Sequence, residues 1–212
     1  LATLASAQII TTNPVFIAKD YTGEIEIIYD ASLGNKKKKN YAGTDVYAHA
    51  GVITSASTGN SDWKHAPAWL DNSAKYKLTS QGNNKWKLVI TPNMTGYYSL
   101  TAGETVKKLA FVFRNGTGNL QGKDTGNADI FVNVYDAGLN VAFTSPTANQ
   151  SVTVGAAVNF TVSSSLAANL DLKMNGSSVK TAATATSLTH NQNFSSTGDY
   201  TFIASATLDG KT

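Results

Sequence analysis

The chain has 212 residues, of which 42% are hydrophobic and only 15% are charged, and its formal net charge at pH 7 is +3. The hydrophobic content suffices for a core, whereas the low charge excludes coiled coils, charged helical bundles and charge-driven disorder. The absence of cysteine excludes disulfide scaffolds, thiolate metal sites and cysteine nucleophiles. The lysine cluster at residues 36–39 is bounded by Gly and Asn, so we interpret it as a solvated turn and expect no nucleic-acid partner.

At the N-terminus, Ala5-Ser6-Ala7 before Gln8 has the small-x-small pattern that signal peptidase cleaves. We therefore expect residues 1–7 to be the remnant of a signal peptide, and the protein to be secreted, periplasmic or on the cell surface. An ordinary frayed N-terminus is the alternative. No stretch approaches the roughly 20 apolar residues of a membrane-spanning helix, so we expect no transmembrane segment.

Further along the chain, apolar and polar residues alternate as they do in strands. Such runs occur at residues 25–29, 46–50, 86–90, 109–113 and 130–134, and stretches rich in Gly, Asn and Pro separate them. The pattern shows no convincing helix. It predicts an all-β fold, in which short strands form an antiparallel sandwich over residues 8–137.

The composition changes near residues 136–138, because all three tryptophans and eight of the nine tyrosines precede this point. Residues 144–146 and 151–155 resemble the opening strands of an immunoglobulin-like domain, and Asn175-Gly176 predicts a hairpin turn. Tyr200 follows Gly198-Asp199 and resembles the corner tyrosine before a late strand. We thus predict a second antiparallel sandwich at residues 138–212, immunoglobulin-like and truncated, since the sequence stops in a turn at residues 209–212.

No pattern typical of catalysis is present in this sequence. The acidic residues occur singly, without the paired carboxylates of a glycosidase, and no Gly-x-Ser-x-Gly elbow is found. His49, His65 and His190 lack the spacing of zinc ligands. We therefore expect a chain that is not an enzyme, and an acyl or glycosyl hydrolase remains only a minor alternative.

The aromatic residues of the first domain suggest a binding surface. If the small apolar residues of the strand at 45–53 face the core, Tyr47 and His49 point outward together. Trp63 and Trp69 flank a proline and fit no apolar alternation, and flat aromatic faces of this kind stack on sugar rings. Both can also be ordinary core or loop anchors. Trp86 shares its parity with apolar residues and is predicted to lie in the core.

The glycine-rich loop at residues 114–129 is a second candidate for binding, because it is long and rich in hydrogen-bonding side chains. A plain hairpin connection is the alternative. Asp124, Asn127 and Asp129 are potential calcium ligands, but the regular spacing of an EF-hand is missing. We expect no cofactor or resident metal, and calcium is the one ion kept as an alternative.

Four segments, taken together and in order, resemble a known family. They are Val46–Thr54, the segment with Trp63 and Trp69, residues 110–116 and residues 129–132. They resemble the starch-binding β-sandwich near the N-terminus of secreted α-amylase-family enzymes from gut Bacteroidetes, a module similar to carbohydrate-binding families 25 and 26. The resemblance spans residues 15–137, and the segment after it resembles the immunoglobulin-like linker that these enzymes carry before their catalytic barrel.

The resemblance implies non-catalytic binding of α-1,4-linked glucan, such as starch and maltooligosaccharides, by a monomer that is covalently followed by an amylolytic domain. Carried over by position, the ligand-binding residues are Tyr47, His49, Trp63, Lys123 and Asp124. Related modules commonly have a Trp followed by Asp and Asn where residues 120–122 here are Leu, Gln and Gly, so we assign the second aromatic wall to Trp69. The alternative function is a structural spacer or adhesion module without a sugar site.

Overall fold

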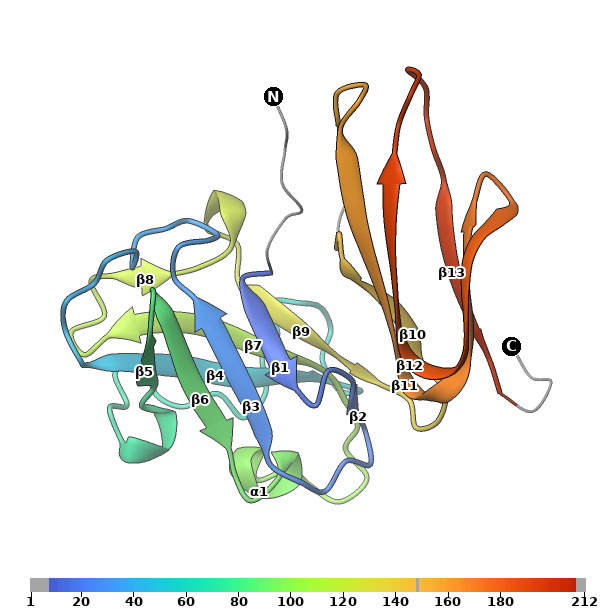
Figure 1. Ribbon diagram of the computed structural model, residues 1–212. Helices are drawn as coiled ribbons and strands as arrows, with labels where there is room; N and C mark the ends of the chain where they lie inside the picture. Colours follow the sequence, from blue (N-terminus) through green and yellow to red (C-terminus); the bar gives the residue numbers. More distant parts are fainter. Residues whose placement is uncertain (1–7, 148, 209–212) are drawn as a thin grey trace. The chain divides into compact units, whose positions relative to one another are not determined.

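The computed structural model describes residues 8–147 and 149–208 (Figure 1). The predicted signal-peptide remnant, residues 1–7, and the final turn at residues 209–212 lie outside the described residues. The chain divides into two compact units, the first formed by Gln8–Ala137 and the second containing the described residues from Gly138 onward. The predicted all-β class is confirmed, because strands dominate both units. Among the described residues, no helix combines the length and the hydrophobicity that crossing a bilayer demands.

The first unit is a sandwich of two sheets. One sheet consists, in spatial order, of β1 (Ile10–Asn13), β3 (Ile25–Asp30), β6 (Lys85–Ile90) and β5 (Thr79–Gly82). The other consists of β2 (Ile17–Ala18), β9 (Ile130–Tyr135), β7 (Val106–Asn115) and β4 (Val46–Thr54), with the short β8 (Gln121–Gly122) paired to β7. Neighbouring strands are antiparallel except for the two-residue pairing of β2 with β9, which is parallel.

The core of the first unit lies between these two sheets. The alternating residues Ile25, Ile27 and Tyr29 of β3 are fully buried, and the Tyr29 ring stacks on Phe113 of the opposite sheet with 4.2 Å between ring centres. Trp86 is only 6% exposed and belongs to this core, as its parity predicts.

Short helices occur where the sequence suggested only turns. The helix α1 spans Met94–Tyr98, and 3-10 helices span Ala74–Tyr76 and Thr125–Asn127. Asn93 caps α1, because its side-chain oxygen accepts a hydrogen bond from the Gly96 N–H at 2.8 Å. A helix of five residues is too short to display helical periodicity, which explains why the sequence pattern did not reveal it.

One interpretation of the lysine cluster is wrong. Lys38 is not solvated but fully buried, and its Nζ lies 3.8 Å from the centre of the Tyr41 ring. Among the described residues, this ammonium group has no hydrogen-bond partner. The segment therefore folds inward at Lys38, where a cation–π contact with Tyr41 takes the place of water.

The second unit consists of β10 (Val141–Ser145), β11 (Ala157–Met174), β12 (Ser177–Asn193) and β13 (Phe202–Thr207). The long hairpin of β11 and β12 curves along its length (Figure 1), and its register shifts between Ser163 and Ala168. The first half of β11 pairs with β10, and the second half pairs with β13. Phe160 of the first half stacks on Phe202 of β13 at 4.1 Å, so the two halves enclose a core between two layers.

Local features of the second unit match the predictions in part. Asn175 and Gly176 both have positive φ angles, 49° and 86°, and form the hairpin turn between β11 and β12. The Tyr200 hydroxyl donates a hydrogen bond to the Ser196 carbonyl at 3.1 Å, four residues upstream, as in a tyrosine corner. Residues 151–155, however, are not a strand; they form an irregular turn from which Val152 packs against the core.

Candidate functional site

The outer face of the β4–β7–β9 sheet carries most of the predicted binding residues. On β4 the small apolar residues face the core and are fully buried, so Tyr47 and His49 lie together on the outer face. Antiparallel pairing places Arg114 of β7 opposite Tyr47. Phe131 of β9 belongs to the same face, because it pairs with Ala110 in the row of Gly51.

His49 is the centre of an aromatic cluster on this face. Its imidazole lies nearly parallel to the Trp63 ring, with 5.7 Å between centres, and meets Trp69 edge-on at 5.0 Å. Trp63 in turn meets Phe131 edge-on at 6.2 Å. We call Tyr47, His49, Trp63, Trp69 and Phe131 the aromatic cluster; it brings together four of the residues that the sequence singled out.

The segment between β4 and β5 carries both tryptophans across this face. Lys64 pairs with Val52 through two backbone hydrogen bonds of 2.8 and 3.0 Å, and Lys77 forms a bridge with Tyr47. These contacts place the Trp63 ring directly over Gly51, where a Cβ would lie only 3.1 Å from the ring. Gly51 is therefore the residue that leaves room for Trp63.

The two tryptophans differ in what they present to solvent. The Trp63 ring is half-buried, and its indole N–H donates to the Asn60 carbonyl at 2.9 Å. The Trp69 ring is 38% exposed, and its nitrogen-bearing edge lies against Gly118 of the loop after β7. Trp69 thus offers the larger free ring, and Trp63 forms the more rigid part of the surface.

Arg114 is a site residue that the sequence interpretation missed. It is fully buried, and its guanidinium carbon lies 5.5 Å from the Tyr47 ring centre and 5.8 Å from that of Trp69. Its terminal nitrogens donate to the Asn72 side-chain oxygen at 2.7 Å and to the carbonyls of Asp71 and Asn115 at 2.8 and 3.1 Å. Arg114 therefore fastens the segment after Trp69 to the sheet. The parity of Arg114 with Val112, opposite to that of the core phenylalanines, was the signal available in the sequence.

The electrostatic environment keeps His49 neutral near pH 7. Burial and the nearby Arg114 charge hold the pKa of His49 below its ordinary value, and Asp129 opposes this shift. The His49 Nδ1 is buried and has no hydrogen-bond partner within the described part of the chain. A neutral imidazole in this position behaves as a flat packing surface between the two tryptophans.

No protein-family model matches the chain, and no curated protein matches it at a significant level.

The two predicted polar residues of the glycine-rich loop lie in different environments. Lys123 forms an ion pair of 3.0 Å with Asp129, the residue directly before β9, the strand that carries Phe131. Asp124 instead accepts a hydrogen bond from the Thr125 N–H at 2.7 Å and begins the 3-10 helix of the loop. The backbones of both Lys123 and Asp124 lie against Gly34, and the Lys123 carbonyl accepts a hydrogen bond from the Asn35 N–H at 2.9 Å.

The oxygens considered for calcium have other partners. Asp129 pairs with Lys123, the Asp124 carboxylate accepts from Thr125, and the Asn127 side-chain oxygen accepts from the Asn35 amide at 3.1 Å. Within residues 8–147 and 149–208, no group of three or more His, Asp or Glu side chains is arranged to hold a metal ion.

The chemical character of the site is that of a recognition surface. An exposed indole ring, a half-buried indole ring and a neutral imidazole adjoin one another, and the Lys123–Asp129 pair supplies a hydrogen-bond donor and acceptor directly before β9. Apolar rings with a few polar groups at their edge suit a ligand that has both apolar faces and hydroxyl groups.

Proposed function

We propose that the first unit is a non-catalytic carbohydrate-binding module that binds α-1,4-linked glucan through the aromatic cluster. The observation that carries this proposal is the Trp69 ring, 38% exposed and edge-on to the His49–Trp63 stack. A large aromatic ring that stays partly exposed on an ordered sheet is typical of a binding surface.

The surroundings of Trp69 favour a rigid platform over a mobile loop. Arg114 holds the chain directly after Trp69 by its hydrogen bonds to residues 71 and 72. The backbone bridge between Lys64 and Val52 holds the segment before it. Rings that are positioned before the sugar arrives lose little conformational entropy on binding, which increases affinity.

In the proposed role, the module keeps a covalently attached amylolytic domain at its polysaccharide substrate, in a protein that is secreted, periplasmic or on the cell surface. This part of the proposal is supported by the family resemblance and the signal-peptide-like N-terminus. The module acts as a monomer, and sugar hydroxyls bind to Lys123 and Asp129 beside the rings.

Affinity electrophoresis in native gels that contain amylopectin tests the proposal. The wild-type protein is expected to be retarded, whereas Trp69→Ala is expected to bind about fivefold more weakly or worse, because stacking on one ring contributes about 1 to 3 kcal/mol by analogy with stacking on bases. Tyr21→Ala is the matched control, since Tyr21 is an aromatic residue with 36% exposure outside the cluster.

Two outcomes would contradict the proposal. Equal mobility of wild type and Trp69→Ala at every amylopectin concentration would favour the spacer or adhesion alternative. Release of reducing sugar from soluble starch, abolished by one substitution in this chain, would show that the protein is itself an enzyme.

A further inference from the structure

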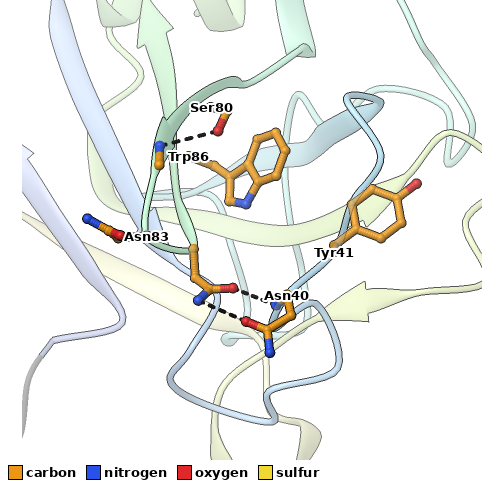
Figure 2. Close-up of a pocket in the computed structure, with 7 residues that line it drawn as sticks. Asn40, Tyr41, Ser80, Asn83 and Trp86 are labelled. Atoms are coloured by element: carbon orange, nitrogen blue, oxygen red, sulfur yellow. Dashed lines mark hydrogen bonds between the residues drawn. The ribbon is translucent and has the colours of Figure 1, made fainter.

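A separate pocket lies on the first unit, where the turn between β5 and β6 meets the segment before β4 (Figure 2). It has a volume of about 400 Å³, within the range of small-molecule sites, and its lining residues are Asn40, Tyr41, Ser80, Gly82, Asn83, Asn84 and Trp86. None of these residues belongs to the aromatic cluster. None carries a charge, so the lining favours a neutral, hydrogen-bonding ligand over a phosphate or a carboxylate.

Trp86 supplies an unused donor to this pocket. The residue as a whole is 6% exposed, but its indole N–H is not among the buried polar atoms that lack a partner, so this donor is open to the pocket. Figure 2 shows the nitrogen-bearing edge of the ring on the side of Asn40. Because no side chain or backbone group of the described residues occupies this donor, a ligand oxygen can accept a hydrogen bond from it.

Tyr41 forms a second wall that is fixed before any ligand binds. The buried Lys38 ammonium lies 3.8 Å from the centre of the ring, and the Tyr41 hydroxyl donates to the Asp45 carboxylate. The Asp45 carboxylate also accepts from the Gly116 N–H at 2.8 Å. These contacts hold the Tyr41 ring from one side and at its end, and leave the ring beside the pocket.

The asparagines give the pocket a defined polar rim. The Asn84 side chain accepts from the Asn40 N–H and donates to the Asn40 side-chain oxygen at 3.3 Å, so both residues are held in place. Asn40 has a φ of 58°, a left-handed conformation that asparagine tolerates better than most residues. In the described part of the chain the Asn40 amide nitrogen has no partner, so it remains available as a donor.

We propose that this pocket is a second carbohydrate site, which takes one pyranose unit or the end of a chain. The surface of the pocket is mainly polar, so Asn40, Ser80 and the Trp86 indole N–H bond the hydroxyl groups of the sugar, and the Tyr41 ring borders the site. The site is independent of the aromatic cluster in its residues and its sheet. That its sugar is an α-linked glucose unit rests on the proposed function above.

A variant in which Trp63 and Trp69 are both replaced by alanine isolates the pocket, because Trp86 is then the only tryptophan. Its indole N–H gives a single side-chain signal in a proton–nitrogen correlation spectrum. Titration with maltotriose to roughly tenfold above a Kd of about 1 mM is expected to shift this signal saturably. Asn40→Gly, which keeps the positive φ, is expected to weaken sugar binding at least threefold. Gln81→Ala is the matched control, because Gln81 lies in β5 between the lining residues Ser80 and Gly82 but does not line the pocket.

The outcomes separate the two proposals. A Trp86 signal that does not move in this variant, while the wild type is retarded by amylopectin, overturns the second site and leaves the proposed function standing. A saturable shift without any effect of Trp69→Ala on amylopectin binding supports the pocket and contradicts the aromatic cluster as the glucan site. A shift of the Trp86 signal with cellotriose but not with maltotriose overturns the assignment to α-linked glucose. An equal loss of maltotriose affinity in Asn40→Gly and Gln81→Ala overturns the pocket as the place of binding.

Discussion

The aromatic cluster and the Figure 2 pocket each depend on a fully buried cation, but the two cations are stabilised differently. Arg114 lies beside the rings of Tyr47 and Trp69 and makes three hydrogen bonds with its terminal nitrogens. Lys38 contacts the Tyr41 ring and has no hydrogen-bond partner among the described residues. A planar guanidinium can contact rings and fill several acceptors at once, whereas an ammonium buried without acceptors tends to lose its proton.

The two buried cations also differ in how readily they lose their charge. Burial lowers the pKa of Lys38 to about 8, and the nearby Asp45 carboxylate opposes the shift only in part. The Arg114 guanidinium stays charged at any physiological pH. The aromatic cluster thus has a permanent positive charge beneath it, while the charge behind the pocket changes with pH in the mildly basic range.

The largest expected effect separates the tryptophans of the two regions. Trp86→Ala is expected to destabilise the protein by about 3 to 5 kcal/mol, because it removes a ring that is 6% exposed from the core. Trp69→Ala removes a ring that is 38% exposed and is expected to leave the melting temperature nearly unchanged. Thermal unfolding followed by circular dichroism measures both. A Trp86→Ala protein that melts with the wild type would contradict the assignment of Trp86 to the core.

Arg114→Met is expected to be the next most severe change. It removes three hydrogen bonds from a charged donor and leaves the Asn72 side chain and the Asp71 carbonyl without this partner. A loss of about 3 kcal/mol in the free energy of unfolding is expected, together with weaker amylopectin retention, because Trp69 loses its support. Urea unfolding gives the first quantity. Lys107→Met, which alters an exposed lysine on the same strand, serves as the control and should change stability little.

Lys38→Met is expected to have the opposite sign and to depend on pH. Because the folded-state pKa of about 8 lies below that of an unfolded lysine, the unfolded chain binds more protons and wild-type stability rises between pH 8 and about 10. The substitution removes the buried charge and should stabilise the protein by about 1 to 2 kcal/mol at pH 7. The difference in the free energy of unfolding between variant and wild type should shrink toward pH 10, which urea unfolding at pH 7 and pH 10 measures. An equal difference at both pH values would show that the Lys38 charge is not the cause.

The smallest expected effect concerns His49. Its pKa lies below the ordinary 6.5, mainly through burial and then through the Arg114 charge, so the neutral form is favoured in the folded state. The stability contributed by neutral His49 is complete above about pH 6.5 and declines as the pH falls below it. His49→Phe keeps a flat ring without a titrating group. The free energy of unfolding, measured with urea, should therefore fall less between pH 7.5 and pH 5 in the variant than in the wild type. Equal losses in both proteins would argue against His49 as the titrating group.

The strands of the first unit could be predicted from the sequence because burial there follows a period of two. Buried residues alternate along β3 and β6, and the same parity placed Tyr47 and His49 on the outer face. The gathering of Trp63 and Trp69 around His49 is different. It depends on the pairing of Lys64 with Val52 and on the space above Gly51, which no local pattern encodes.

The two buried cations show where prediction from composition fails. Lysine and arginine are usually exposed, so a run of lysines indicates a solvated turn and an arginine after a strand indicates the start of a loop. Arg114 is buried nevertheless, because oxygens of residues 71 and 72 accept its hydrogen bonds. These residues are more than 40 positions away in the chain. Similarly, β11 (Ala157–Met174) changes its register with β12 between Ser163 and Ala168, which no local sequence pattern encodes.

The strand β4 lies at the end of its sheet, and the segment that carries the two tryptophans bridges to it at Val52 and at Tyr47. An uncovered strand edge pairs readily with other chains, which is a common start of aggregation. The segment between β4 and β5 displays the aromatic rings and also occupies part of that edge, so it protects the protein from self-association. Replacing this segment by a compact turn would thus remove Trp63 and Trp69 from the aromatic cluster and leave a protein that is prone to form intermolecular sheets.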